Sequence, residues 1–202
     1  MKKLLILGLF FALFISSGCS LKKTEKPAPN NSNQTGREQN LSEQANTETR
    51  LVAKDDFTLE APANWKESQA LVPGVSLMMV NSTENSDRPE IKRINFKSYF
   101  SVSYDTLGEN SLEQYTANTK KELAGMIAGI SFQALAPTII DGRPAQVFSA
   151  DLTQQGVNFK LLMFIAEGKN KDIWIISFNT PMESFNGYQG LFSEIATSFR
   201  LK

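Results

Sequence analysis

The sequence predicts an α+β domain in which an antiparallel sheet of about six strands lies between helices, as an αβα sandwich. Apolar residues recur at steps of three and four over residues 112–130, the period of an amphipathic helix. Three hairpin signals follow, and a second amphipathic pattern closes the chain. Two strands, 159–166 and 173–178, are apolar on both faces and therefore need a helical layer on each side.

The first 19 residues predict export. Residues 1–3 are basic at two positions, residues 4–15 are uncharged and apolar, and a small-residue segment leads directly to Cys19. This pattern resembles the lipobox of bacterial lipoproteins, although Ser16 stands where that motif usually has leucine. The resemblance implies cleavage before Cys19, which then carries acyl chains and holds the protein on the extracytoplasmic face of a membrane.

Three other interpretations of this segment compete with the lipoprotein. The apolar run is too short to cross about 30 Å of hydrocarbon as a helix. An ordinary secretory signal cut after Gly18 stays open as an alternative to the lipoprotein. A buried core helix is disfavoured by the basic start and by the polar segment that follows.

The predicted domain organisation has three parts. Residues 1–18 are the signal peptide, and residues 19–50 are a polar tether with almost no apolar side chains, which cannot bury enough surface to fold alone. As a flexible coil it would span roughly 30 Å. Residues 51–202 are one domain of ordinary size.

Composition argues against several function classes. Without the leader the chain has 19 basic and 21 acidic residues, so no basic field for nucleic acid is expected. The chain has no histidine, and Cys19 is its single cysteine, which excludes Ser-His-Asp and Cys-His catalysis and disulfides within the chain. The usual zinc, copper and haem ligands are missing too, so neither a metal nor a cofactor is expected. Oxygen ligands could still hold calcium or magnesium.

The first half of the domain predicts mainly strands. Residues 57–59 and 75–80 are short strand patterns, a turn leads to Trp65, and the polar segment 81–90 is expected to be an exposed loop. Residues 94–104 alternate between apolar and polar side chains and predict the clearest strand of this half.

The first helix covers residues 112–130 and can begin in two ways. Asn110 with Glu113, or Ser111 with Gln114, has the spacing of a capping box. The three hairpin turns that follow are expected at Asp141-Gly142, at Gln155-Gly156 and at residues 168–171. Asp-Gly favours the positive φ angles of a type I′ turn.

The last helix carries an apolar seam at Phe185, Tyr188, Phe192, Ile195 and Phe199. Residues 180–183, Thr-Pro-Met-Glu, predict its start, with threonine as N-cap and proline at the first helical position.

Four segments resemble the PsbP/Mog1-like fold, including the DcrB-type bacterial lipoproteins. They are F-T-L-x-A-P-x-x-W at residues 57–65, S-L-E-Q-Y at 111–115, D-G-R-P-A at 141–145 and Y-x-x-L-F-x-x-I-x-x-S-F at 188–199. The resemblance implies an αβα sandwich used for binding or assembly without catalysis. Members serve partners as different as photosystem II and a small GTPase, so the fold does not name a partner.

Few side chains stand out as functional candidates. Tyr99 and Arg143 are expected at the surface as a weak partner-binding pair, because Tyr and Arg are typical of interface hot spots. Trp65 and Trp174 could be ligand platforms but are better explained as core residues.

Two further patterns are weaker indications of a site. The acidic loop residues Glu84, Asp87 and Glu90 could collect a cation, but a merely soluble loop is favoured. The S-x-x-K match at residues 20–23 lies in the tether and is discounted as a catalytic dyad.

The predicted function is therefore a non-catalytic, membrane-anchored lipoprotein that binds a protein or envelope component. One alternative is a carrier of a small apolar ligand, in a pocket between sheet and helix lined by Met78, Met126, Met163 and phenylalanines. The other is a carboxylate-based hydrolase, which needs two facing Asp or Glu residues in a cleft.

Overall fold

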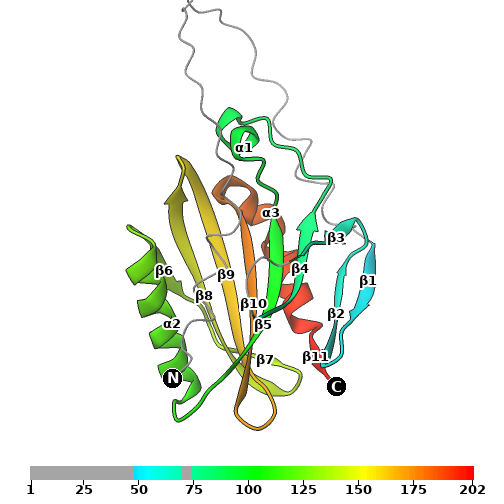
Figure 1. Ribbon diagram of the computed structural model, residues 1–202, viewed down its shortest axis with the longest axis vertical. Helices are drawn as coiled ribbons and strands as arrows, with labels where there is room; N and C mark the ends of the chain where they lie inside the picture. Colours follow the sequence, from blue (N-terminus) through cyan, green and yellow to red (C-terminus); the bar gives the residue numbers. More distant parts are fainter. Residues whose placement is uncertain (1–47, 70–73) are drawn as a thin grey trace, which may run out of the picture.

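Two antiparallel sheets and two long helices build the domain in the computed structural model, which describes residues 48–69 and 74–202 (Figure 1). The strands are β1 Thr49–Ala53, β2 Phe57–Pro62, β3 Trp65–Glu67, β4 Val75–Asn81, β5 Tyr99–Thr106, β6 Ser131–Ala134, β7 Thr138–Ile140, β8 Arg143–Gln154, β9 Val157–Glu167, β10 Asp172–Pro181 and β11 Arg200–Leu201. The helices are α1 Pro89–Ile94, α2 Leu112–Met126 and α3 Phe185–Thr197.

The larger sheet has eight strands, in the order β3-β4-β5-β10-β9-β8-β6, with β7 also paired to β8. The prediction of about six strands is too low, whereas the α+β class with an antiparallel sheet is confirmed. One added strand arises because the predicted strand 132–140 is divided into β6 and β7 around Pro137, which has no backbone N–H to donate. The short strand β3 adds another at the edge.

The small sheet has the order β1-β2-β11 and was not predicted. In it, the last strand of the chain pairs with the start of β2, Arg200 with Thr58 and Leu201 with Phe57. This pairing brings the end of the domain beside its beginning.

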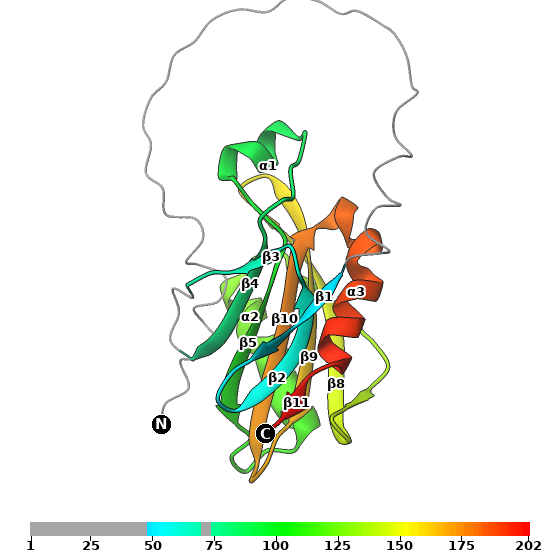
Figure 2. The same ribbon diagram turned by 90° about the vertical axis from the view of Figure 1, so that its right-hand side faces the viewer.

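β10 carries apolar side chains on both faces, so each face of the larger sheet is covered by a packed layer. Trp174, Ile176 and Phe178 belong to a core that also contains side chains of β2 and α3, whereas Ile173 and Ile175 belong to the core beneath α2. Figure 2 shows α3 and the small sheet on one side of the larger sheet and α2 on the other. The predicted sandwich is confirmed, with the small sheet sharing one helical layer.

The turns and caps follow the sequence closely. Asp141 and Gly142 have φ angles of 51° and 71°, so both central residues have the positive φ that a type I′ turn requires. The N-cap of α2 is Ser111, whose hydroxyl accepts from the Gln114 backbone while the Gln114 side chain accepts from Ser111. Of the two possible capping boxes, the structure has this one.

Three predicted boundaries are wrong. The helix expected over residues 112–130 ends at Met126. The strand expected over 94–104 begins only at Tyr99, because Pro89 starts the short helix α1 and Asn95 ends it with a φ of 50°. The C-terminal helix does not begin at Thr180, because Thr180 and Pro181 still pair with β9. The Thr180 hydroxyl bonds to Ser98 instead of capping a helix. The predicted apolar seam of α3 is buried as expected.

The signal peptide, Cys19 and nearly all of the tether lie outside the described residues, as does the S-x-x-K match. The first strand begins at Thr49, within the range assigned to the tether. Among residues 48–69 and 74–202, no helix is both long and apolar enough to span a bilayer.

Candidate functional site

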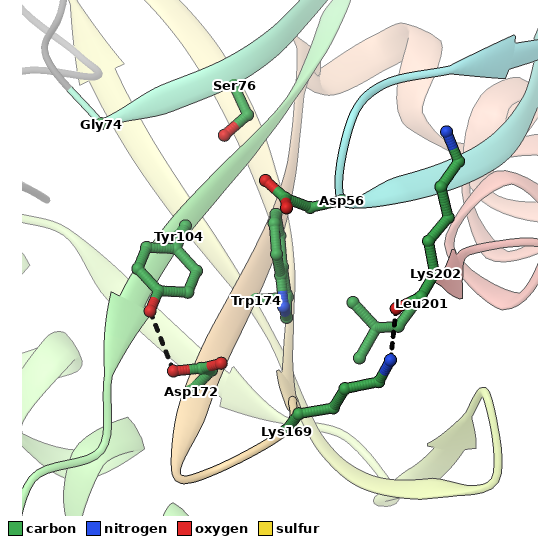
Figure 3. Close-up of a pocket in the computed structure, with 9 residues that line it drawn as sticks. All are labelled: Asp56, Gly74, Ser76, Tyr104, Lys169, Asp172, Trp174, Leu201 and Lys202. Carbon is green, nitrogen blue, oxygen red and sulfur yellow. Dashed lines mark hydrogen bonds between the residues drawn. The ribbon is translucent and has the colours of Figure 1, made fainter.

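A cavity of about 450 Å³ lies at the end of the larger sheet, between that sheet and the small one. Its walls come from the β1–β2 turn, the start of β4, the β9–β10 turn and the end of the chain (Figure 3). The lining residues are Asp56, Gly74, Ser76, Tyr104, Lys169, Asp172, Trp174, Leu201 and Lys202. Segments far apart in sequence therefore meet here.

Two aromatic residues form the floor of the cavity. Tyr104 of β5 and Trp174 of β10 are directly paired across the strands, and their ring centroids lie 5.3 Å apart in an edge-to-face arrangement. Trp174 is only 4% exposed, whereas Tyr104 is 43% exposed. The Tyr104 hydroxyl donates to Asp172 Oδ1 at 2.8 Å, so the ring is held in place.

The wall opposite the sheet is fixed by aromatic packing. Phe57, the residue after Asp56, packs edge-to-face on Trp174 with centroids 5.3 Å apart. The backbone carbonyl of Asp56 accepts from the Lys202 backbone N–H at 3.0 Å. Asp56 is thereby placed at the upper edge of the indole, as Figure 3 shows.

The two lysines that line the cavity donate hydrogen bonds to backbone oxygens. The Lys169 ammonium donates to the backbone oxygen of Lys202, and the Lys202 ammonium donates to the backbone oxygen of Lys54. Neither Asp56 nor Asp172 forms an ion pair with any residue that the structure describes. The cavity therefore has two carboxylates that form no ion pair with a described residue, beside two aromatic rings.

Arg143, predicted to be an exposed contact residue, is half-buried at the start of β8. Its Nη1 donates to the backbone oxygen of Gly168 at 2.9 Å. Arg143 thus supports the β9–β10 turn beside the cavity, and the turn carries Lys169 and leads into Asp172.

Gly168 is required for this turn because a side chain has no room there. A Cβ at this position would lie 2.9 Å from the Asp172 Cβ and 3.0 Å from the indole of Trp174. We expect Gly168→Ala to destabilise the protein by at least about 1 kcal/mol through overpacking. Gly190→Ala, in α3 with nothing within 4 Å, should instead stabilise it by up to about 1 kcal/mol. Urea unfolding of both variants checks this, and a loss for both would contradict it.

The expectation that Tyr99 is exposed is wrong. It is 4% exposed at the start of β5, and Phe96 packs against it with centroids 6.0 Å apart. The segment carrying Phe96 was expected to be part of the same strand but instead folds back after α1. Tyr99 is thus unable to contact a partner.

The acidic loop is held by protein contacts. Glu84 accepts hydrogen bonds from the backbone N–H and from the hydroxyl of Ser98. Its Oε1, which binds the Ser98 hydroxyl, also accepts from the Tyr188 hydroxyl at 3.3 Å. Glu90 is paired with Arg88. Within the described part of the chain, no group of three or more Asp, Glu, His or Cys residues could hold a metal ion.

All four tyrosines have a pKa above the usual value of 10. Burial is the main cause for Tyr99, for Tyr115 and for Tyr188, whose pKa rises to about 12. For Tyr104 the main cause is the hydrogen bond to Asp172. A raised pKa means that the folded state favours the neutral phenol over the tyrosinate. The resulting contribution to stability is fully present below pH 10 and is lost as the pH rises through the folded pKa values.

We therefore expect the folded protein to show little tyrosinate absorbance at about pH 10, where tyrosine in an unfolded chain is half ionised. An ultraviolet titration of the native protein and of the urea-unfolded protein measures the difference. Superimposable curves would contradict the burial and hydrogen bonding described for these residues.

The other predicted candidates are placed as follows. Trp65 and Trp174 are core residues, as expected, although Trp174 also lines the cavity. Met78 is half-buried, Met126 is 36% exposed and Met163 is buried; none of them lines this cavity. It is therefore not the methionine-lined pocket that the carrier alternative requires.

Sequence reasoning missed Asp56, Asp172 and Tyr104. Tyr104 is one of the apolar positions in the alternating pattern of residues 94–104, and the two carboxylates lie at a turn and at a strand end, where charged residues are ordinary. The pairing of β5 with β10 and of β2 with β11 brings them together. No local signal in the sequence indicates these pairings.

Comparison with known proteins bears on the fold. Neither a protein-family model nor a curated protein sequence matches the chain. Among solved structures, cyanobacterial PsbP from Synechocystis is similar with a TM-score of 0.56 and 14% identity, covering 84% of this chain and 98% of its own. The chain has the PsbP/Mog1-like fold.

Two further structures support the PsbP/Mog1-like fold. The Ran-binding protein Mog1p of Saccharomyces cerevisiae matches with a TM-score of 0.54 and 14% identity, over 77% of this chain and 96% of its own. LpqN of Mycobacterium tuberculosis, involved in cell envelope biogenesis, also has a TM-score of 0.54, with 11% identity, over 77% of this chain and 91% of its own. At these identities the likeness concerns the fold alone.

Proposed function

We propose that this protein is a lipid-anchored, extracytoplasmic binding module of the DcrB type, without a catalytic role, that contacts a protein or envelope component through the cavity between its two sheets. The observation that carries the proposal is the cavity itself. It combines a half-exposed tyrosine, a tryptophan floor and two carboxylates that have no ion-pair partner among the described residues. Tyrosine and tryptophan are among the residue types enriched at the hot spots of binding surfaces.

The absence of catalysis is supported by the sequence. The chain has no histidine, and its single cysteine is the proposed lipidation site. Asp56 and Asp172 are the residue type that the hydrolase alternative requires, and they line one cavity. The Tyr104 hydroxyl donates a hydrogen bond to Asp172, however, and Asp56 is exposed to solvent. Neither carboxylate therefore lies in the apolar setting that keeps a general acid protonated.

Anchoring rests on the leader and Cys19. Two or three acyl chains bind a bilayer far more firmly than one, since each buried methylene contributes about 0.8 kcal/mol. A domain held in this way meets partners at the membrane surface. Two of the similar proteins are a Ran-binding protein and a protein involved in cell envelope biogenesis, which supports a binding role for this fold.

Site-specific photocrosslinking tests the proposed surface. p-Benzoylphenylalanine is placed at the position of Tyr104 or, as a matched control, at that of Met126, which is similarly exposed but lies on α2, across the larger sheet from the cavity. In intact cells we expect a discrete adduct from the Tyr104 position and none from the Met126 position. Equal adducts from both positions, or none from Tyr104, would contradict the proposal.

A further inference from the structure

The charges around the cavity are separated by Trp174. In Figure 3, Tyr104, Asp172 and Ser76 lie on one side of the indole, and Asp56 lies at its upper edge. Leu201 and the Lys169 ammonium lie on the other side, where that ammonium bonds to the backbone of Lys202. A ligand on the tyrosine side therefore meets carboxylates and aromatic rings rather than ammonium groups.

The aromatic floor is suited to a positive charge. The faces of tryptophan and tyrosine rings attract cations, with about 0.5–1 kcal/mol gained at exposed sites and more after desolvation. Carboxylates at Asp56 and Asp172 add Coulomb attraction for the same charge. A carboxylate or phosphate ligand would meet repulsion from both acids in the same place.

A second, independent feature concerns the indole N–H. Trp174 lines the cavity, and its Nε1 donates no hydrogen bond to any residue in the described part of the chain. The indole N–H is a donor only. This donor at the cavity floor would suit a carbonyl oxygen of a ligand whose cation sits between the carboxylates.

We propose that the cavity binds an organic cation, the guanidinium or ammonium group of an arginine or lysine side chain presented by a protein partner. This inference rests on the proposed function and specifies the chemistry of its site. Asp56 and Asp172 bind the charge, Tyr104 and Trp174 supply the aromatic surface, and the Trp174 N–H donates a hydrogen bond to a peptide carbonyl oxygen of the partner. Asp172 is oriented for this by the Tyr104 hydroxyl.

The two tryptophans make the test direct, because an ¹⁵N–¹H spectrum of the full chain in detergent contains only two indole signals. Trp174 lines the cavity, whereas Trp65 is buried against Phe100 and Tyr188 and serves as the internal control. N-acetyl-arginine methylamide is the probe, and its citrulline counterpart has nearly the same shape without the charge. We expect a saturable shift of the Trp174 signal with the arginine probe alone, weakened by added salt.

Asparagine variants test which carboxylates bind the cation. Asp56→Asn and Asp172→Asn should each weaken binding about threefold to fivefold, the size expected for a solvent-accessible ion pair. Asp55→Asn removes the same charge from the neighbouring exposed position, which does not line the cavity, and should leave binding unchanged. Equal weakening by all three variants would mean a diffuse charge effect and would overturn the assignment.

Further probes decide the ligand class. Tighter binding of the arginine probe than of n-butylguanidine, which has the same single charge without the peptide groups, assigns the cation to a protein side chain; the reverse order contradicts that assignment. A saturable response to phosphate or to the citrulline probe would overturn the inference. If the Trp174 signal does not shift but crosslinked adducts form at the Tyr104 position, the cation ligand is refuted and the proposed binding function stands. If the Trp174 signal shifts but no adducts form, the proposed function is refuted.

Discussion

Phe192→Ala is expected to lower the free energy of unfolding by about 3–5 kcal/mol, the range typical of phenylalanine removed from a packed core. Phe192 is fully buried in α3 and stacks on Phe178 of β10, with centroids 4.6 Å apart, and on Tyr188, at 5.2 Å. It joins the last helix to the central strand of the larger sheet. Its loss therefore leaves a cavity where one helical layer meets the sheet.

Leu51→Ala is the control for this variant. Leu51 lies on β1 and is 67% exposed, so its truncation should change stability by less than about 0.5 kcal/mol. Urea unfolding followed by circular dichroism measures both. Similar losses for the two variants, or a loss below about 1 kcal/mol for Phe192→Ala, would contradict the packing of α3 described here.

Ser98→Ala is expected to cost about 2–3 kcal/mol because the hydroxyl bonds to a charged group and to a second buried hydroxyl. Ser98 Oγ lies 2.8 Å from Glu84 Oε1 and 2.8 Å from Thr180 Oγ1. The bonds join the acidic loop before α1 to the end of β10. Removing the hydroxyl leaves Thr180, which is fully buried, without this partner.

Ser177→Ala is the matched comparison. Ser177 is as deeply buried as Ser98, but its Oγ has no hydrogen-bond partner among the described residues. Its truncation breaks no bond and removes a desolvated hydroxyl, so stability should stay unchanged or rise. Equal losses in chemical unfolding of the two variants would show that the network around Ser98 contributes nothing beyond burial.

The parts of the fold that the sequence predicts well are those with local signals. The seam of α3, the Ser111–Gln114 cap and the turn at Asp141 each depend on residues close together in the chain, so period and turn chemistry suffice. The boundary errors at residues 94–98 and at Thr180 occur where tertiary pairing overrides such signals. Thr180 has the chemistry of a cap, yet its pairing with β9 and its bond to Ser98 keep it in the strand.

The cavity could not be predicted in the same way. Asp56 faces it because Phe57 packs on Trp174 and because β11, two residues long, pairs with β2. A strand of this length leaves no detectable pattern in a sequence. Tyr99 and Tyr104 illustrate the same point: they occupy opposite faces of β5, and only the layers on either side decide that Tyr99 is covered and Tyr104 is accessible.

The proposed anchor is the part of the account on which the rest most depends, because it decides which partners the cavity meets. Its direct measurement is incorporation of radiolabelled palmitate into the full chain and into Cys19→Ser, together with membrane fractionation of both. We expect label and membrane association in the parent chain and the loss of both in the variant. An unlabelled parent chain, or a variant that fractionates with the membrane as before, would contradict the account.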